Sequence, residues 1–138
     1  MFEDLHAPDG TNQPINNQTL QRIGTVLPFS TAILFAGGNS DWEQAGIVYI
    51  NGVRQTEQIG NFSRPNTFGV GEETFDQEIA VAGWHKRGAP SGGLPWTASR
   101  GQVQGTEGRW DDSFGDLDFN DFTASLTALT GTVHPIGG

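Results

Sequence analysis

The side chains with the strongest potential for chemistry lie in one short acidic segment, Asp-Leu-Asp-Phe-Asn-Asp, at residues 116–121. Asp116, Asp118 and Asn120 alternate, so in an extended backbone their oxygens share one side, and Asp121 follows directly. The two apolar residues between them would then point the other way, into a core. Carboxylates this close repel one another unless a cation neutralises them. The pattern therefore predicts a metal site.

Calcium is the cation that suits these donors, because it takes about six to eight oxygen ligands from carboxylates, amides and main-chain carbonyls. Asp111 and Asp112 lie just upstream, and six oxygen-bearing side chains could serve one ion or two adjacent ions. Magnesium rarely uses so many carboxylates. The absence of Cys and the three scattered His argue against zinc.

An EF-hand is excluded, because its loop needs Gly at the sixth position and Glu at the twelfth. Counted from Asp116, those positions hold Asp121 and Thr127. The competing interpretation is a solvated acidic turn that binds no ion.

The elements that position this segment are predicted to be short strands. Twenty Gly and seven Pro indicate many turns, and Asn51-Gly52 is a strong hairpin signal. We expect an all-β fold, a β-sandwich of about eight to nine short antiparallel strands. Residues 1–19 would be an N-terminal arm or loop, and residues 20–138 a single domain. The strand candidates are residues 20–27, 31–36, 45–51, 53–59, 75–84, 102–104 and 122–133.

Charge and hydropathy restrict the partners. The net charge of −9 argues against nucleic acid, and five of the sixteen acidic residues fall between Asp111 and Asp121. No apolar run has the length of a membrane span, so we expect no membrane insertion. The N-terminus lacks the features of a signal peptide. We therefore expect synthesis in the cytoplasm, and action on extracellular glycans would then need release by a non-classical route.

Other candidate sites are weaker. Trp84 and Trp96 bracket a Gly- and Pro-rich loop and could form an aromatic platform, but packing is the favoured interpretation. Glu72 and Glu73 are adjacent, so in a strand they face opposite sides and cannot act as a glycosidase pair. His6, His85 and His134 lack metal-ligand spacing and are predicted to be surface residues. We expect no enzymatic activity.

The acidic segment is similar to the Asp-x-Asp-Tyr-Asn-Asp loop of the calcium-dependent fucose- and mannose-binding lectins of bacteria, the LecB type. Residues 31–40 resemble the strand and sugar-contacting loop near the start of those lectins. Residues 47–52 resemble the next strand and turn, and Pro-Ile-Gly-Gly at 135–138 resembles the Pro-Leu-Gly terminus. The resemblance runs roughly from Leu27 to the end and implies a β-sandwich lectin with two calcium ions.

By this resemblance Asp116, Asp118 and Asp121 would be calcium ligands, with the last two shared by both ions. Asn120 would bind one ion only. Asp111-Asp112 matches the Glu-Asp pair of the family, but one extra residue separates it from Asp116, so either Asp could be the ligand.

Two further ligands are implied by the resemblance. One is a main-chain carbonyl near Gly37. The other is the carboxylate of Gly138 from the partner subunit of a homodimer or higher oligomer. Gly138 lies seventeen positions after Asp121, further than in the family.

The resemblance also implies a binding mode, in which calcium coordinates vicinal hydroxyls of a fucose- or mannose-type sugar. Asp112 and Asp116 would accept hydrogen bonds from those hydroxyls, and Gly38, Asn39 and Ser40 would contact the edge of the sugar. The alternative function is an adhesin or surface-protein module in which calcium is structural and no sugar binds.

Overall fold

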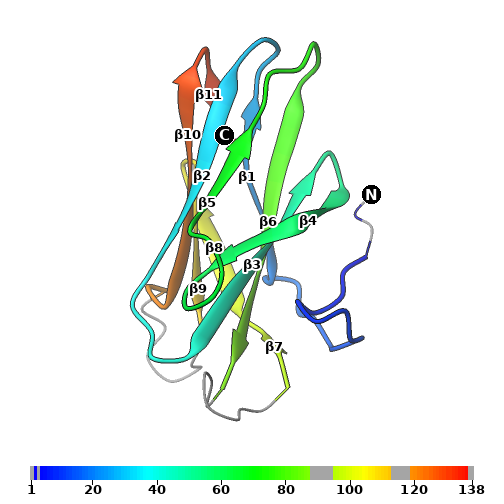
Figure 1. Cartoon of the computed structure of the whole chain (residues 1–138), viewed down its shortest axis with the longest axis vertical. Helices are drawn as coiled ribbons and strands as arrows, with labels where there is room; N and C mark the ends of the chain where they lie inside the picture. Colours follow the sequence, from blue (N-terminus) through cyan, green and yellow to red (C-terminus); the bar gives the residue numbers. More distant parts are fainter. Residues whose placement is uncertain (1, 3, 88–94, 113–118, 137–138) are drawn as a thin grey trace.

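The computed structural model describes residue 2 and residues 4–87, 95–112 and 119–136, and these residues form eleven strands and no helix (Figure 1). The predicted all-β class is confirmed. The strands are β1 (Leu20–Val26), β2 (Thr31–Gly37), β3 (Glu43–Ile50), β4 (Val53–Gly60), β5 (Thr67–Val70), β6 (Gln77–Lys86), β7 (Thr97–Ala98), β8 (Arg100–Gln104), β9 (Glu107–Asp111), β10 (Phe122–Thr130) and β11 (Val133–His134).

The strands make two antiparallel sheets that pack as a sandwich. One sheet has the order β11-β1-β6-β3-β4, with β7 paired to β6, and the other has the order β5-β2-β10-β9-β8. Strands that are distant in sequence, such as β2 and β10, therefore lie side by side. In Figure 1 the β2–β3 and β4–β5 connections gather at the lower end, whereas the β5–β6 connection lies at the upper end.

Alternating apolar side chains build the core between the sheets. On β10, Phe122, Ala124 and Leu126 are buried while the residues between them are less so, which is the predicted period of two. They pack with buried residues of the opposite sheet, including Val48 and Val81. Burial of this apolar surface is the main favourable contribution to folding.

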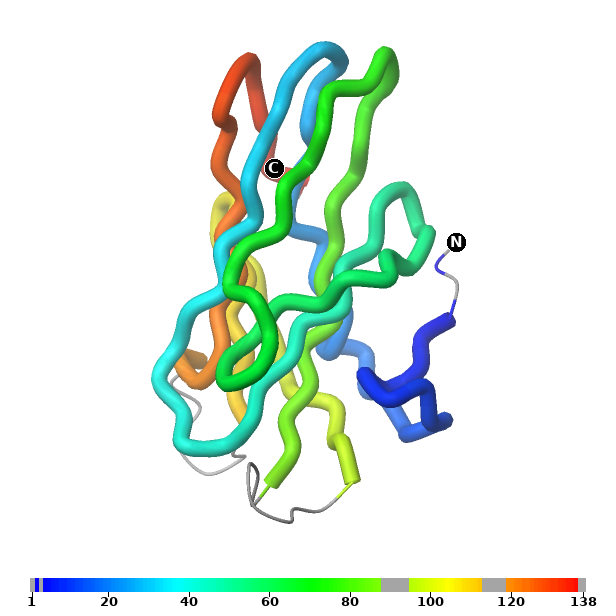
Figure 2. Tube along the Cα trace, in the orientation of Figure 1, coloured from blue at the N-terminus to red at the C-terminus, as the bar shows by residue number. Residues whose placement is uncertain are grey.

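Strands β3 and β6 are buried on both faces, which explains their near-continuous apolar sequences. Val48 contributes to the core between the sheets, whereas its neighbours Ile47 and Tyr49 belong to a second cluster on the outer face. Ala7 completes that cluster with the N-terminal segment, whose tube lies against this sheet in Figure 2. A strand with two covered faces carries no polar alternation.

Hydrogen bonds to main-chain carbonyls hold the N-terminal segment in place. Arg54 Nη1 donates to Asp4 and His6, Arg54 Nη2 donates to Ala7, and the Tyr49 hydroxyl also donates to Asp4. Residues 4–19 contain no strand, and residues 4–8 lie against the outer face of this sheet as a cover.

The predicted β3–β4 hairpin is present. Asn51 and Gly52 have φ values of 52° and 84°, as a two-residue turn with left-handed central residues requires. The prediction missed the strands β5, β7 and β9, and it ran β10 and β11 together as one strand. Gly-rich or charged sequences such as β9, Glu-Gly-Arg-Trp-Asp, carry little strand signal of their own. No helix in the described ranges is long and apolar enough to cross a membrane.

Trp110 is among the largest side chains of the core between the sheets, and glycines make the space for it. It is fully buried and its indole N–H donates to the Thr19 carbonyl over 2.9 Å. A Cβ atom at Gly108 would lie 2.5 Å from the Trp110 ring and 2.6 Å from Ile23. A Cβ at Gly101 would lie 2.5 Å from the indole nitrogen.

We therefore expect Gly108→Ala to lower the free energy of unfolding by about 2 kcal/mol, because the packed ring cannot move aside without strain. Urea denaturation measures the change. Gly69→Ala on β5 is the control, since no atom lies within 4 Å of its added Cβ, and it should change stability by less than about 0.5 kcal/mol. Equal losses in the two variants would contradict this account of Trp110.

Candidate metal centre

Three carboxylates meet where β9 ends and β10 begins. The two strands pair antiparallel with Trp110 opposite Phe122, so the residues that follow one and precede the other are neighbours. Asp111, Asp112 and Asp121 each place a carboxylate oxygen within 4.8 Å of the other two. Asp111 is fully buried and Asp112 is 5% exposed. Buried carboxylates at this spacing suit a hard cation.

The Asp112 carboxylate is held by two donors from the β2–β3 side of the site. Its Oδ2 accepts hydrogen bonds of 2.7 Å from Ser40 Oγ and 2.7 Å from Gln44 Nε2. Ser40 Oγ in turn accepts the backbone N–H of Trp42. Donors to an ionised carboxylate make strong bonds, so the orientation of Asp112 is determined before any ligand arrives.

Asp121 is held by the main chain just after β9, because its Oδ2 accepts the backbone N–H of Asp112 over 2.9 Å. Burial, together with the side chains of Asp111 and Asp112, raises the pKa of Asp121 to about 7, although the hydrogen bond from the Asp112 N–H opposes the rise. The cluster therefore resists full ionisation on its own. A bound divalent cation would reverse this effect.

The predicted sugar-contacting loop lies against the acidic segment. Asn39 donates its backbone N–H to the Asn120 carbonyl over 2.8 Å. Gly38 has a φ of 126°, and a Cβ there would overlap the main chain of Asp121, so only glycine fits. Gly37 pairs with Thr123 at the end of β2.

The structure thus brings together Asp111, Asp112, Asn120 and Asp121 with the loop of residues 37–40. The coordination by Asn120 and by the Gly37 carbonyl stays a prediction. Asp116, Asp118 and Gly138 lie outside the described residues, and their roles also stay predictions.

Gln44 is a site residue that sequence reasoning missed. It is 1% exposed, and its Oε1 is buried with no hydrogen-bond partner in the part of the chain that the structure describes. A buried polar atom without a partner calls for an explanation such as an ion or water. In the sequence Gln44 only precedes an apolar strand, so nothing marks it as functional.

The prediction that His85 lies on the surface is wrong. It is 1% exposed, lies 2.8 Å from Ser99 Oγ through Nδ1, and stacks on Trp42 with ring centroids 6.0 Å apart. Burial lowers the pKa of His85. The packing interpretation of Trp84 and Trp96 is confirmed, since both are buried in the outer cluster.

A pocket of ≈ 450 Å³ adjoins the acidic cluster. Gly38, Ser40 and Asp121 line it together with residues of the β4–β5 connection, among them Phe62 and Arg64. A smaller pocket of ≈ 240 Å³ is lined by Ser40, Asp112 and their neighbours Asp41 and Trp42. The carboxylates are therefore next to space that a ligand could enter.

No protein-family model matches the chain, and no curated protein matches it. Among solved structures, one similar chain is the high-affinity mannose-binding lectin of Ralstonia solanacearum. It is 14% identical, with a TM-score of 0.48, over 85% of this chain and 100% of the lectin chain. A likeness of this extent assigns neither a family nor a ligand.

Crowding of the three carboxylates gives a test that needs no ligand. In chelator at pH 8, Asp121→Asn should raise the melting temperature, because it removes a desolvated charge while its amide oxygen can still accept the Asp112 N–H. We expect a gain of roughly 4 °C, the size that about 1 kcal/mol produces in a domain of this length.

The gain should depend on pH with a defined sign. A raised carboxyl pKa means that the cost of the charge is present above about pH 7 and disappears as the pH falls towards the ordinary value of 3.8. Thermal melts across this range measure the difference between variant and wild type. Asp76→Asn, at an exposed position outside the cluster, removes the same charge and should change little. A lower melting temperature for Asp121→Asn at pH 8 would contradict the crowding.

Proposed function

We propose that this protein is a calcium-dependent carbohydrate-binding protein, a lectin without enzymatic activity. The observation that carries the proposal is the convergence of Asp111, Asp112 and Asp121 beside a pocket. Gly37, Gly38 and Ser40 also line this pocket. An acidic cluster with two buried carboxylates and one partly buried carboxylate could hold a cation, and the adjoining pocket could admit a ligand at the same end of the sandwich. The sequence resemblance to the fucose- and mannose-binding lectins supports the same function.

The donor set fits calcium. All three side chains offer hard carboxylate oxygens, and burial with two neighbouring carboxyl groups raises the pKa of Asp121, a cost that a bound cation would relieve. Asp116, Asp118 and Asn120 would complete the shell and would allow a second ion. Bound calcium supplies coordination positions that vicinal hydroxyls of a sugar can fill in place of water.

The protein residues around the ion would orient the sugar. Ser40 and Gln44 hold Asp112 in position, so that carboxylate does not need to reorganise on binding. Asn39 is exposed at the edge of the site and can donate and accept hydrogen bonds. We expect fucose- or mannose-type sugars as ligands, and a homodimer as the assembly.

A second candidate function is a module in which calcium is purely structural. The burial of Asp111 and Asp112 favours it, because an ion bound by buried ligands stabilises the fold without contacting solvent. The two functions predict the same response to calcium and different responses to sugar.

The decisive experiment combines melting and titration. Calcium should raise the melting temperature, because a ligand that binds only the native state at about 100 times its Kd stabilises it by about 2.7 kcal/mol. Fucose or mannose should then give heat in calorimetric titration with calcium and none in chelator. Stabilisation by calcium without binding of fucose, mannose or galactose would favour the structural module, and an unchanged melting curve would reject both.

Two variants in the loop of residues 37–40 distinguish effects on sugar specificity from effects on calcium binding. Asn39→Ala removes an exposed side chain and keeps the backbone bond to Asn120, so it should alter the ratio of fucose to mannose affinity at unchanged calcium affinity. Ser40→Ala removes a donor to Asp112 and should weaken calcium binding about tenfold, the effect of about 1.4 kcal/mol. Calcium and sugar titrations of both variants measure these changes. Equal calcium affinities in the two variants would contradict the positioning role of Ser40.

A further inference from the structure

Phe62 is an exposed aromatic residue beside the proposed lectin site. It is 52% exposed, and its φ of 57° lies in the left-handed region that a bulky residue rarely adopts. It lines the ≈ 450 Å³ pocket that also contacts Gly38, Ser40 and Asp121. Unusual backbone conformations held by their surroundings are concentrated at functional sites.

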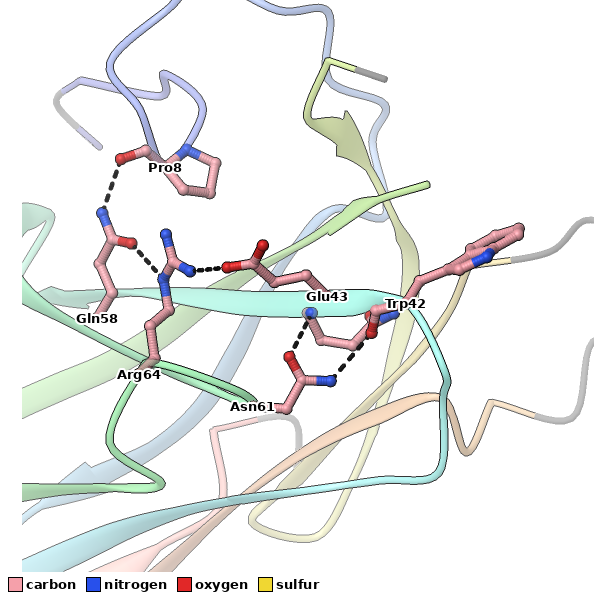
Figure 3. A network of polar contacts seen from close by, with 7 residues as sticks. Pro8, Trp42, Glu43, Gln58, Asn61 and Arg64 are labelled. Atoms are coloured by element: carbon pink, nitrogen blue, oxygen red, sulfur yellow. Dashed lines mark hydrogen bonds and ion pairs between the residues drawn. The ribbon is translucent and has the colours of Figure 1, made fainter. Parts of the chain in front are cut away.

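The loop that carries Phe62 is firmly held, so its conformation is built into the fold. Figure 3 shows Asn61 bridging the start of β3: its Oδ1 accepts the Gln44 N–H over 2.8 Å and its Nδ2 donates to the Trp42 carbonyl over 3.0 Å. The Gly60 N–H donates to the Pro65 carbonyl over 3.0 Å and closes the loop.

Arg64 fastens the other side of the loop. Its Nε donates to Gln58 Oε1 over 2.9 Å and its Nη1 forms an ion pair with Glu43 (Figure 3). Its guanidinium also lies 5.0 Å from the centroid of the Trp96 ring. With Asn61 just before Phe62 and Arg64 two positions after it both anchored, the ring is presented to solvent at low entropic cost to a ligand.

Gln44 ties this loop to the metal centre. Its backbone N–H bonds to Asn61 and its side-chain amide bonds to Asp112, over 2.8 Å and 2.7 Å. Phe62 and the acidic cluster therefore have fixed relative positions beside the same pocket. The pocket volume of ≈ 450 Å³ lies within the range of about 300–1,000 Å³ that small-molecule binding sites occupy.

Resting on the proposed function, we propose that this pocket is a second subsite, in which Phe62 receives the apolar face of the sugar unit linked to the one held at the metal centre. Sugars present C–H groups on one face and hydroxyls at the edge. An exposed ring beside polar groups complements such a surface. The protein would thus be selective for oligosaccharides over single sugars, and Phe62 would be a specificity-determining residue.

The test compares one-unit with two-unit ligands at saturating calcium. Methyl α-mannoside and methyl α-fucoside are the one-unit probes, and fucosyl-galactose and a set of mannobioses that differ in linkage are the two-unit probes. At least one two-unit probe should bind wild type about tenfold more tightly than its one-unit counterpart, as contacts of about 1.4 kcal/mol provide. Phe62→Asn should abolish this gain and leave one-unit binding within about twofold.

Asparagine is chosen because it tolerates a positive φ, so the loop can keep its conformation without the ring. Phe62→Trp should retain the gain. Phe75→Asn is the matched control, because Phe75 is also 52% exposed but lies in the β5–β6 connection at the opposite end of the sandwich (Figure 1). It should retain the gain as well.

The outcomes distinguish a failure of the subsite from a failure of the lectin function. Calcium-dependent binding of single sugars with no gain for any two-unit probe overturns the subsite and leaves the lectin function standing. A gain that persists in Phe62→Asn also overturns it. If no sugar binds to wild type in calcium, both proposals fail together.

Discussion

The pairing of β9 with β10 forces like charges together, and much of the lower end of the sandwich follows from this constraint. Trp110 opposite Phe122 is an apolar pair that fills the core. The residues next to that pair, Asp111 and Asp121, must then be adjacent, whatever their charge. Folding thus brings carboxylates into a partly desolvated corner, and apolar burial elsewhere offsets the cost.

The hydrogen bonds to Asp112 and Asp121 come from uncharged donors, which stabilise an ionised carboxylate without neutralising its charge. Asp112 receives an amide and a hydroxyl, and Asp121 receives a backbone N–H. Among the residues that the structure describes, no Lys or Arg makes an ion pair with Asp112 or Asp121. Burial is the main cause of the raised pKa of Asp121, and the neighbouring side chains of Asp111 and Asp112 add to it. Such an arrangement is suited to a positive charge that arrives from solution.

Sequence periodicity predicted the features that depend on local pattern. The alternation on β10 and the Asn51-Gly52 turn are local, and both were found where expected. What failed depends on contacts between distant segments. Gln44 and His85 flank or end apolar runs, and only the pairing of β3 with β6, which places them opposite each other, reveals that both are buried.

The candidate site divides in the same way. The clustering of acidic residues along the chain predicts a shared site for Asp111, Asp112 and Asp121, and the ligand role of Asp111 or Asp112 is implied by the family resemblance. The β4–β5 connection was not predicted, because Asn-Phe-Ser-Arg-Pro reads as an ordinary turn. Its proximity to the cluster arises from the β3–β4 hairpin, which returns the chain to the end of the sandwich where β3 began.

Gln44 explains why the two loops can act as one surface. A strand residue has a backbone that bonds in the plane of the sheet and a side chain that projects from it. Gln44 uses its backbone N–H for Asn61 and its side chain for Asp112, so one residue orients both the aromatic loop and the carboxylate. Any shift of β3 would displace them together. The relative position of Phe62 and the acidic cluster therefore depends on the rigid sheet instead of on either loop, which is the condition for a preorganised site.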